Sequence, residues 1–547
     1  MKRYLIIAAI LLAGCSKNDL TDQKGNLASV IKNSPLHKLS AVGDVVGKIT
    51  VGYQGWFSCV NDGSPNSSIW WHWTSDNAIP STSNYGIKAW PDMREYTTGY
   101  QTGFANLGNG QPAKLFSSYN DQTIATHFLW MQQNGIDAAA LQRFNPNQGE
   151  GPFRDAITPK VQKAAETYGR KFYIMYDVSG WTNMQSEIKT DWTNKMKAYT
   201  SSTAYAKQNG MPVVCIWGIC FNDASHPFSE SVCLDVVNWF KSQGCYVIGG
   251  VPREWRTVNA AYDPVYKALN MLSPWLIGSL GDAQTDDQFY TNYYVPDEAY
   301  CAANGIDYQP CVLPGDISVK QRVHGDFMWH QFYNVVKAGA QGIYISMFDE
   351  FNEGNQIAKT AENASMIPVG SNFVGLDEDG IACSSDYYLR LTNDGGRMLK
   401  GLIPLTPVRP TAPVAGGSLQ HLPPIGQNVT LKGSNSLYVS SENGTSPMTC
   451  TRTGAGAWET FTVVDAGNGK IALMNQGKYV SSENGGGPIT CNRTAVGPWE
   501  QFDYTLNTDG TVTLRGSNLG YISIEDGIQP MTCTRTTAGA TEKFIMN

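Results

Sequence analysis

Three acidic residues stand at the end of a strongly apolar run in YISMFDEFNEGNQI, residues 344–357: Asp349, Glu350 and Glu353. The apolar run predicts a buried strand, and a buried carboxylate is costly unless hydrogen bonds or charges compensate it. Glu350 and Glu353 would face opposite sides of a continuing strand, but they converge where the strand turns into a loop. Two neighbouring carboxyls separate their pKa values, leaving one as acid and one as base, and cleavage of a glycosidic bond needs this division of roles.

The same acidic residues also have a structural interpretation. One glutamate of the pair would then cap a helix or form an ion pair with Arg253 or Arg256. Asp349 considered alone fits a structural role better than a catalytic one.

Polar and aromatic side chains follow other apolar runs as well. In a parallel barrel the C-terminal strand ends surround one mouth, where the site is built. Carboxylates, arginines and aromatic rings together suit a ligand with hydroxyl groups and apolar ring faces. The strand-end residues in chain order are Tyr53, Gln54, Trp56 and Phe57, then Gln142 and Arg143, Tyr176 and Asp177, Trp217, the run Arg253–Arg256, and Asp316.

The fold class follows from eight apolar runs between residues 47 and 405. Segments with helical spacing separate most of them, for example ATHFLWMQQNG (125–135) and DFMWHQFYNVVKAGA (326–340). This alternation predicts a parallel sheet covered on both faces, and the number of runs favours a (β/α)₈ TIM barrel, an α/β fold. An open doubly wound sheet is the alternative, although no G-x-G-x-x-G follows the first run. The runs are ITVGYQGWF (49–57), IDAAALQRF (136–144), KFYIMYDVS (171–179), PVVCIWGI (212–219), CYVIGGVP (245–252), PWLIGSL (274–280), YQPCVLPG (308–315) and GIYISMF (342–348).

The N-terminus is a targeting segment. Lys2 and Arg3 precede the apolar run YLIIAAILLAG, which ends in LLAGC at Cys15. This pattern resembles the lipobox of bacterial lipoproteins, in which the cysteine is lipidated, and an ordinary cleaved signal peptide is the alternative. We therefore expect residues 1–15 to be a signal peptide ending at a lipidated Cys15, and residues 16–46 to tether the protein to the outer membrane or cell surface.

The C-terminal region contains three repeats: 437–461, 478–502 and 520–544. Their equivalent cysteines are Cys450, Cys491 and Cys533, and each repeat carries short β-type runs separated by Asn-Gly or Asp-Gly turn signals. Three such units predict an all-β β-trefoil, and the pattern resembles the fascin-like β-trefoils. It has W-E-x-F where ricin-type trefoils have Q-x-W, and the third repeat replaces the tryptophan with Thr541. We expect the repeated cysteines to be small core residues.

The domain boundaries follow from composition. The segment 406–428 is rich in Pro and Gly and predicts a linker. It separates a catalytic domain at 47–405 from the trefoil at 429–547, which would bind either glycan or protein.

Composition excludes some classes of function. The net charge is −7 with no basic run, which argues against nucleic-acid binding, and the chain has neither C-x-x-C nor H-E-x-x-H. We therefore expect no metal site and no cofactor. We also expect a monomer, in which the 11% of aromatic residues serve the core or contact sugar rings.

The segment GIYISMFDEFNEGNQI (342–357) resembles strand eight of glycoside hydrolase family 99 and of the related family 71, where the family 99 pattern is roughly S-x-N-E-W-x-E-G-T-Q-I. VGYQGWFSCVNDGSPNSSIWWHW (51–73) is similar to the first strand and loop of that clan, and YDVSGW (176–181) fits its third strand. Asp349 and Phe351 depart from the family's Asn and Trp, which suggests a sister group with a different substrate.

The resemblance implies a retaining glycoside hydrolase acting on an α-linked polysaccharide, most simply an endo-acting enzyme on α-mannan. Glu350 would be the base that activates the sugar 2-hydroxyl to form a 1,2-anhydro sugar. Glu353 would be the acid that protonates the leaving oxygen and later activates water. Tyr53, Trp56, His72 and Asp177 become substrate contacts by resemblance, and Arg143, Trp217, Arg256 and Asp349 are added from their strand-end positions.

Two alternatives remain from the sequence. Family 71 relatives act on α-1,3-glucan, so that polymer is a second candidate substrate. The other alternative is an inactive glycan-binding lipoprotein of the cell surface, which the intact pair of glutamates argues against. Arg322 and His324 precede the last predicted barrel helix and are explained equally well by capping and packing.

Overall fold

The computed structural model describes residues 39–546 apart from 258–259, 415–422, 424, 427, 468–469 and 508–510. Cys15, the signal peptide and most of the predicted tether lie outside the described residues. None of the described helices is long and apolar enough to cross a membrane.

Parallel strands form one curled sheet in the N-terminal part of the described chain. The last strand, β12, pairs with β1, while β10 pairs with β9 and β11 pairs with β12, so that the segment 307–312 completes the circle. The predicted (β/α)₈ barrel is therefore confirmed. The strands are β1 (Ile49–Tyr53), β4 (Ala138–Arg143), β5 (Lys171–Asp177), β7 (Met211–Trp217), β8 (Tyr246–Pro252), β9 (Met271–Trp275), β10 (Asp307–Tyr308), β11 (Cys311–Val312) and β12 (Ile343–Ile345).

The strands coincide with the apolar runs because both of their faces are covered. Side chains of β1 and β4 are buried at every position, which is the pattern of a parallel sheet packed between its own interior and a layer of helices. One boundary in the prediction is wrong: the sixth strand covers 271–275, whereas the predicted run began at 274. Polar Ser273 interrupts the apolar residues and separates Met271 and Leu272 from the run that begins at Pro274.

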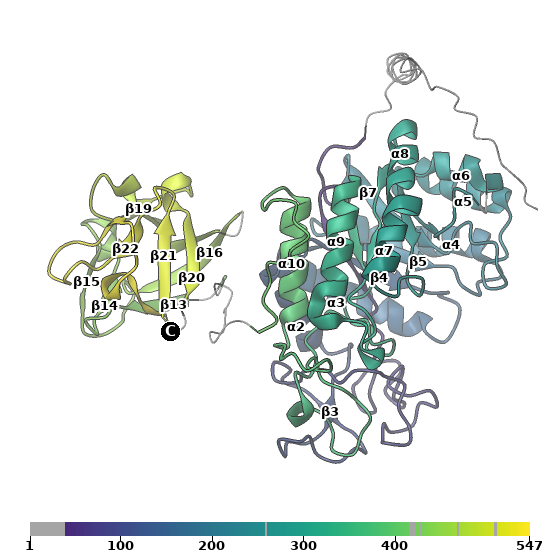
Figure 1. Ribbon diagram of the computed structural model, residues 1–547, viewed down its shortest axis with the longest axis horizontal. Helices are drawn as coiled ribbons and strands as arrows, with labels where there is room; N and C mark the ends of the chain where they lie inside the picture. Colours follow the sequence, from purple (N-terminus) through teal and green to yellow (C-terminus); the bar gives the residue numbers. More distant parts are fainter. Residues whose placement is uncertain are drawn as a thin grey trace, which may run out of the picture.

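Helices connect the strands and cover the barrel (Figure 1). α9 packs against α7 and α10, and α5 packs against α4 and α6. The helices are α2 (Asp121–Gln133), α3 (Gly151–Thr167), α4 (Met184–Asn194), α5 (Glu230–Ser242), α6 (Asp263–Ala268), α7 (Ala283–Phe289), the π-helical turn η3 (Tyr290–Tyr294), α8 (Val295–Asn304), α9 (Asp326–Ala338) and α10 (Tyr387–Leu399). The short strands β2 (Tyr100–Gln101), β3 (Lys114–Leu115) and β6 (Lys207–Gln208) lie in connections.

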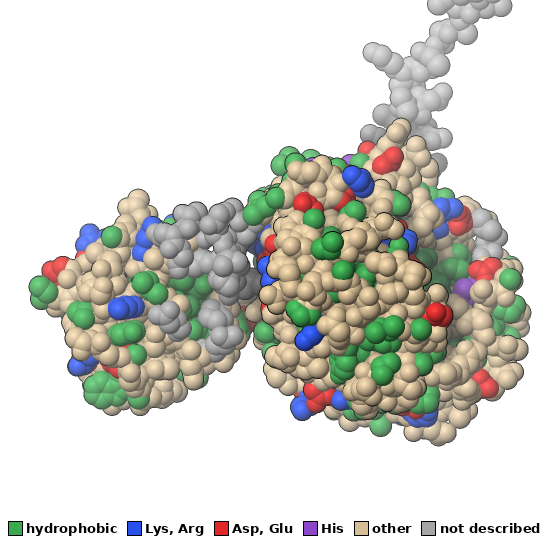
Figure 2. All heavy atoms as spheres, turned by 90° about the horizontal axis from the view of Figure 1, so that it is seen from below, with side chains coloured by type: hydrophobic (Ala, Val, Ile, Leu, Met, Phe, Trp, Pro, Cys, Tyr) green, Lys and Arg blue, Asp and Glu red, His purple; other side chains and the backbone are tan. Residues whose placement is uncertain are grey.

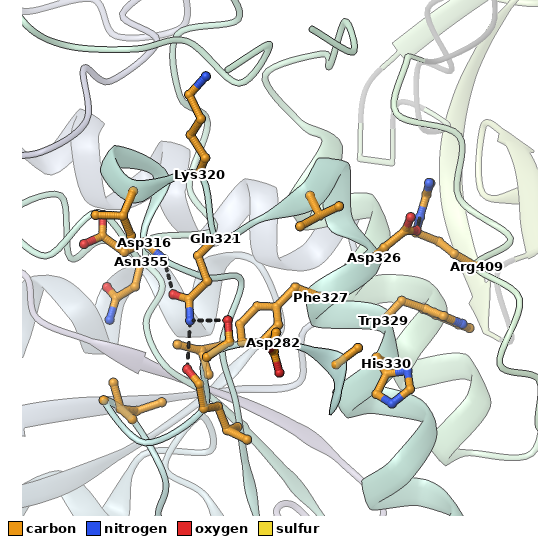
Figure 3. Close-up of a pocket in the computed structure, with 18 of the residues that line it drawn as sticks. Asp282, Asp316, Lys320, Gln321, Asp326, Phe327, Trp329, His330, Asn355 and Arg409 are labelled. Atoms are coloured by element: carbon orange, nitrogen blue, oxygen red, sulfur yellow. Dashed lines mark hydrogen bonds and ion pairs between the residues drawn. The ribbon is translucent and has the colours of Figure 1, made fainter. Parts of the chain in front are cut away.

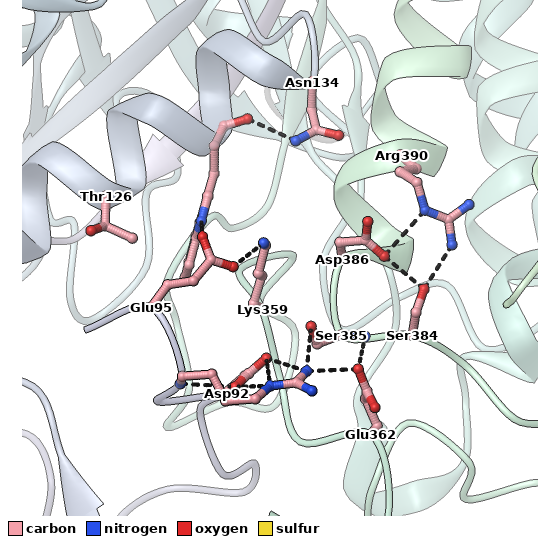
Figure 4. A network of polar contacts seen from close by, with 12 residues as sticks. Asp92, Glu95, Thr126, Asn134, Lys359, Glu362, Ser384, Ser385, Asp386 and Arg390 are labelled. Carbon is pink, nitrogen blue, oxygen red and sulfur yellow. Dashed lines mark hydrogen bonds and ion pairs between the residues drawn. The ribbon is translucent and has the colours of Figure 1, made fainter. Parts of the chain in front are cut away.

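A polar network fixes the long loop between β1 and α2 (Figure 4). Arg94 donates to both oxygens of Asp92, at 2.9 Å to Oδ1 and 2.7 Å to Oδ2, and to Glu362 at 2.7 Å. Glu362 also accepts the backbone N–H of Ser385 at 3.1 Å. The network thus joins the first loop to the segment that follows β12 and to the start of α10, all at the C-terminal end of the barrel strands.

The C-terminal region forms an antiparallel sheet of twelve described strands with its own hydrophobic core. Equivalent hairpins pair β14 with β15, β18 with β19, and β22 with β23. The strands are β13 (Asn428–Lys432), β14 (Tyr438–Ser440), β15 (Thr449–Arg452), β16 (Thr460–Gly467), β17 (Lys470–Asn475), β18 (Lys478–Ser481), β19 (Thr490–Arg493), β20 (Phe502–Leu506), β21 (Val512–Gly516), β22 (Tyr521–Ser523), β23 (Thr532–Arg535) and β24 (Ile545–Met546).

The three repeats meet in a cyclic set of backbone hydrogen bonds. Met448 N–H donates to the carbonyl of Ile489 at 2.8 Å, Ile489 N–H to Met531 at 2.8 Å, and Met531 N–H back to Met448 at 3.0 Å. Equivalent positions of the repeats therefore surround one axis. The repeated cysteines lie buried in the core, as their small apolar character predicted: Cys450, Cys491 and Cys533.

The contact between α9 and α10 leaves no room for a side chain at Gly395. A Cβ atom there would lie 2.5 to 2.6 Å from three ring carbons of Phe332. We expect Gly395→Ala to lower the free energy of unfolding by about 1–3 kcal/mol, because overpacking a rigid ring outweighs the better helix propensity of alanine. Thermal unfolding measures the change. Gly149→Ala is the control, since the nearest atom to its Cβ is 3.8 Å away; equal melting of both variants would contradict the packing argument.

Candidate active site

The two glutamates share one turn beyond the end of β12. The strand ends at Ile345, and the chain then folds back so that the N–H of Glu353 donates to the carbonyl of Glu350 at 3.3 Å. Gly354 follows with φ +73°, and a Cβ there would lie 2.7 Å from Oδ1 of Asp316. Glycine is thus required both by the backbone conformation and by the close approach of Asp316.

Asp349 binds the end of β1. Its two oxygens accept the backbone N–H groups of Gln54 and Gly55, each at 2.8 Å, and its side chain is fully buried. Burial raises the pKa of Asp349 to about 6, while the two backbone donors and the charge of Arg154 act in the opposite direction. The prediction that Asp349 contacts substrate is therefore corrected: both oxygens serve the loop that carries Gln54.

Glu350 is buried beside that loop. Gln54 donates from Nε2 to Oε1 of Glu350 at 2.9 Å, and the side chain of Asn355 also hydrogen-bonds to Glu350. Burial, followed by the negative charge of Glu353, raises the pKa of Glu350 to about 8. At neutral pH Glu350 therefore carries a proton in the free protein.

Glu353 stands at the wall of a large cavity. The cavity has a volume of about 1080 Å³ and is lined by Glu353, Asn355, Lys88 and Asp316, by the segment 319–330, and by loop residues from 277–283 and 407–409. Partial burial raises the pKa of Glu353, and the positive charge of Lys88 opposes this rise. The side chain is exposed, in contrast to that of Glu350, so the turn places one carboxyl inside the protein and the other at an open space.

An ion pair borders Glu353 in this cavity. Lys88 Nζ lies 2.6 Å from Oδ2 of Asp316, and the side chain of Asp316 also accepts from the N–H of Ser318 at 2.9 Å. Figure 3 shows Asp316 and Asn355 side by side at one end of the cavity, with Asp326, Trp329, His330 and Arg409 at the other. A ligand that reaches Glu353 would therefore meet polar groups of both signs.

Buried Arg322 holds the loop that carries Glu353. Its guanidinium donates to the carbonyls of Gly354 and Gln356, both at 2.8 Å, and to the carbonyl of Gly315 at 2.9 Å. Burial lowers its pKa. Arg322 therefore supports the site through the backbone.

Aromatic and charged groups meet beside Gln54. Trp56 and His72 stack with ring centroids 3.8 Å apart, and Nε2 of His72 lies 3.3 Å from Oε1 of Glu150. Arg154 pairs with Glu150 at 2.7 Å and also donates to the carbonyl of Gln54. Burial lowers the pKa of His72, which keeps the ring neutral. Two of the predicted contacts, Trp56 and His72, are thus brought together in the loop next to Glu350.

Asp177 and Trp217 lie next to each other at the ends of β5 and β7. Burial raises the pKa of Asp177, while hydrogen bonds from Ser179 and the charge of Arg154 oppose the rise. A relay adjoins them: Oγ of Ser179 is 2.9 Å from Nε2 of His226, and Nδ1 of His226 is 2.8 Å from Asp223. The charge of Arg154 acts on Asp177 and on Asp349, so both carboxylates belong to the same mouth.

Two predicted contacts are buried in the framework instead. Tyr53 is fully buried, and its hydroxyl lies 2.9 Å from Nδ1 of His127. Arg143 is 1% exposed and binds Asp191 bidentately at 2.6 and 2.5 Å. Neither side chain can reach a ligand in this arrangement, so the strand-end prediction for Arg143 and the resemblance-based prediction for Tyr53 are corrected.

Arg256 also lies apart from the glutamates. Its guanidinium pairs with buried Asp297 and donates to the carbonyl of Asn292 at 2.9 Å. It lines a separate cavity of about 480 Å³ together with Trp255, Asp263 and Tyr300. The prediction that Arg256 contacts the substrate of the glutamate pair is corrected accordingly.

Comparison with known proteins gives similarity in structure only. No protein-family model and no curated protein matches the chain. Two structures of the GH99 endo-alpha-mannosidase from Bacteroides thetaiotaomicron, one of them in complex with bis-tris-propane, are similar at 13% identity, with TM-scores of 0.46 and 0.48. Each match covers 65% of this chain and 98% of the other. A designed three-fold symmetric protein, ThreeFoil, is similar over 22% of this chain at 15% identity and a TM-score of 0.21.

Sequence reasoning missed the groups that support the glutamates from a distance along the chain. Lys88 lies in the long first loop, Glu150 and Arg154 flank the start of α3, and Asn355 follows the turn. Gln54 was recognised as a strand-end residue but not as the partner of Glu350. Its position next to the predicted contact Trp56 was the available signal.

The bond from Asp349 to the first loop predicts a measurable cost for a small change. Asp349→Asn replaces one carboxylate oxygen with an NH₂ group, which leaves the buried N–H of Gln54 or Gly55 facing a donor. We expect a loss of about 1–3 kcal/mol in the free energy of unfolding, measured by thermal or denaturant unfolding. Asp121→Asn, at an exposed ion pair with Lys160, is the control and should change stability by less than about 1 kcal/mol. Unchanged stability of Asp349→Asn would show that the loop does not depend on this carboxylate.

Proposed function

We propose that the protein is a retaining glycoside hydrolase that cleaves an α-linked polysaccharide. The single observation that carries the proposal is the turn after β12, on which Glu353 lines the cavity and its negative charge, together with burial, raises the pKa of Glu350. Glycosidic cleavage requires two carboxyls of this kind, one holding a proton and one able to accept one.

Glu350 acts as the base and Glu353 as the acid in this proposal. Amide donors from Gln54 and Asn355 surround Glu350 and stabilise its carboxylate once the proton has left. From there it withdraws the proton of the sugar 2-hydroxyl, whose oxygen attacks the anomeric carbon and gives a 1,2-anhydro sugar. Glu353 faces the open cavity, which suits a group that protonates the departing oxygen and then activates the incoming water.

The sugar and the mode of action rest on the sequence around the turn. The resemblance of residues 342–357 to family 99 favours α-mannan and endo action, and α-1,3-glucan is the second polymer to test. Trp56, His72, Asp177 and Trp217 would contact the sugar from the first, third and fourth strand ends.

The proposal also covers the domain boundaries of the chain and its place in the cell. We propose that residues 47–405 are the catalytic domain, 406–428 a linker and 429–547 a β-trefoil, which the cyclic bonds among Met448, Ile489 and Met531 support. We propose in addition that Cys15 is lipidated and anchors a monomer to the outer membrane or cell surface.

A product screen tests the hydrolase. Protein lacking the residues through Cys15 should release oligosaccharides from α-mannan or α-1,3-glucan, whereas Glu350→Gln and Glu353→Gln should be slower by about 10²–10⁴-fold, since each removes a proton-transferring group. Released reducing ends and product sizes are the measurements. Glu298→Gln, on α8, is the matched control and should retain full activity. Activity of both active-site variants near the wild-type level would make the pair structural.

The pH dependence tests whether the two glutamates act as a pair. The proposed step needs an ionised Glu350 and a protonated Glu353, so the active form carries one proton on the pair, and burial together with the charge of Glu353 raises the pKa of Glu350 to about 8. We therefore expect kcat/KM of the free enzyme to follow a bell-shaped profile whose alkaline limb falls as the pH passes about 8. A profile that keeps rising above pH 8 would contradict the pairing. Initial rates at low substrate concentration give this profile.

A further inference from the structure

Only two aromatic side chains of the described residues are exposed, and they occupy equivalent positions. Trp458 is 40% exposed and Trp499 is 43% exposed, in the first and second C-terminal repeats. Every other described Trp, Tyr and Phe is buried or half-buried. An indole that stays exposed adds nothing to the core, so two of them at the same place in a repeated unit call for an explanation other than folding.

Each tryptophan stands on a rigid turn. The carbonyl of Trp458 accepts the N–H of Ser441 at 2.9 Å, and the carbonyl of Trp499 accepts that of Ser482 at 2.8 Å. Within each turn a buried glutamate fixes the backbone: Glu459 accepts from Gly456 and Glu500 from Gly497, both at 2.8 Å. The rings are therefore held out from fixed backbone positions.

Hydrogen-bonding side chains occur in both repeats, and one of them, Arg452, lies near the first ring. Arg452 lies 5.9 Å from the centroid of Trp458 and binds Glu442 at 2.6 Å, and Thr449 donates to the same glutamate at 2.6 Å. The second repeat has the same set, with Arg493 binding Glu483 at 2.7 Å. The chain reads GAGA just before Trp458, and a Cβ at Gly454 would meet no atom within 4 Å.

We propose that Trp458 and Trp499 are two binding sites for neutral sugar rings of a polysaccharide. A flat exposed indole, in a repeat that also carries an arginine and a threonine, matches a pyranose, which has an apolar face and a rim of hydroxyl groups. This inference goes beyond hydrolysis and stands whether or not the barrel is active.

The charges around the rings favour a neutral ligand. Arg452 is paired with Glu442, and Oε1 of Glu459 lies 3.9 Å from it, so two carboxylates surround one guanidinium. Arg493 has the same surroundings, with Glu483 and Glu500. An acidic polysaccharide or an anionic lipid would be repelled. The residues just before Trp458, 453–457, are small or polar and exposed, unlike the broad apolar patch of a protein interface.

The third repeat is a natural negative control. Thr541 takes the place of the indole, although its carbonyl accepts the N–H of Ile524 at 2.9 Å and Glu542 accepts from Gly539 at 2.7 Å. The turn and its polar neighbours are present without the ring.

Two sites on one chain would bind a polymer more tightly than either site alone.

Affinity electrophoresis tests the sites on the full chain after Cys15. All variants carry Glu350→Gln so that no polymer is cleaved and barrel binding is the same in each. We expect soluble α-mannan or α-glucan to retard the parent, Trp458→Ala and Trp499→Ala each to weaken binding about tenfold, and the double variant about 10²-fold or more. Thr541→Trp should increase retardation above that of the parent.

Ile528→Ala is the matched control, because Ile528 is 83% exposed in the third repeat and should not affect binding. Equal retardation of the parent and the double variant, or no retardation by any neutral polymer, would overturn the proposal. Two other results would also overturn the proposal, provided that polysaccharide binding does not change in the double variant. One is that the double variant loses self-association, and the other is that it loses binding to phosphatidylcholine vesicles. Because the catalytic pair is disabled throughout, failure here is distinct from failure of the hydrolase assignment.

Discussion

The carboxylate of Asp349 joins the two ends of the barrel at the point where the site forms. β12 pairs with β1 and closes the ring, and immediately beyond this pairing Asp349 accepts two backbone N–H groups from Gln54 and Gly55. Gln54 then binds Glu350. The first loop and the turn that carries the two glutamates are therefore one unit, and Trp56 and His72 lie in that loop.

This arrangement explains how three acidic residues are tolerated at the end of a buried strand. Two backbone N–H groups and the charge of Arg154 stabilise the ionised carboxylate of Asp349. Two side-chain amides stabilise the carboxylate of Glu350, and burial raises its pKa, so that the buried group is mostly neutral. Glu353 reaches the cavity, where Lys88 opposes the rise in its pKa. Because protonated Glu350 is favoured in the folded protein, its contribution to stability is present at low pH and is lost as the pH rises through about 8.

The barrel and the pair of glutamates could be predicted from the sequence because both have local signals: continuous apolar runs for strands covered on both faces, and two glutamates just past the last run. The sequence could not show which strand-end side chains point into the mouth. Arg143 ends β4 as expected, but its partner Asp191 lies on α4, 48 residues later, and turns the guanidinium into the framework. The hydroxyl of Tyr53 is likewise held inside the framework by its hydrogen bond with His127. Lys88 and Asp316 meet across 228 residues, and no local pattern predicts such a pair.

A comparison of the three C-terminal repeats distinguishes the residues that the fold requires from the exposed tryptophans, which it does not require. The buried cysteines, the Glu–Arg pairs and the capped turns occur in all three units, and backbone hydrogen bonds among Met448, Ile489 and Met531 join the units to one another. The exposed indole occurs in two units, and the turn closes equally well around Thr541. Neither Trp458 nor Trp499 is therefore required by its own turn. Their exposed area lowers solubility without adding to the core, which is the physical reason to assign them to a ligand.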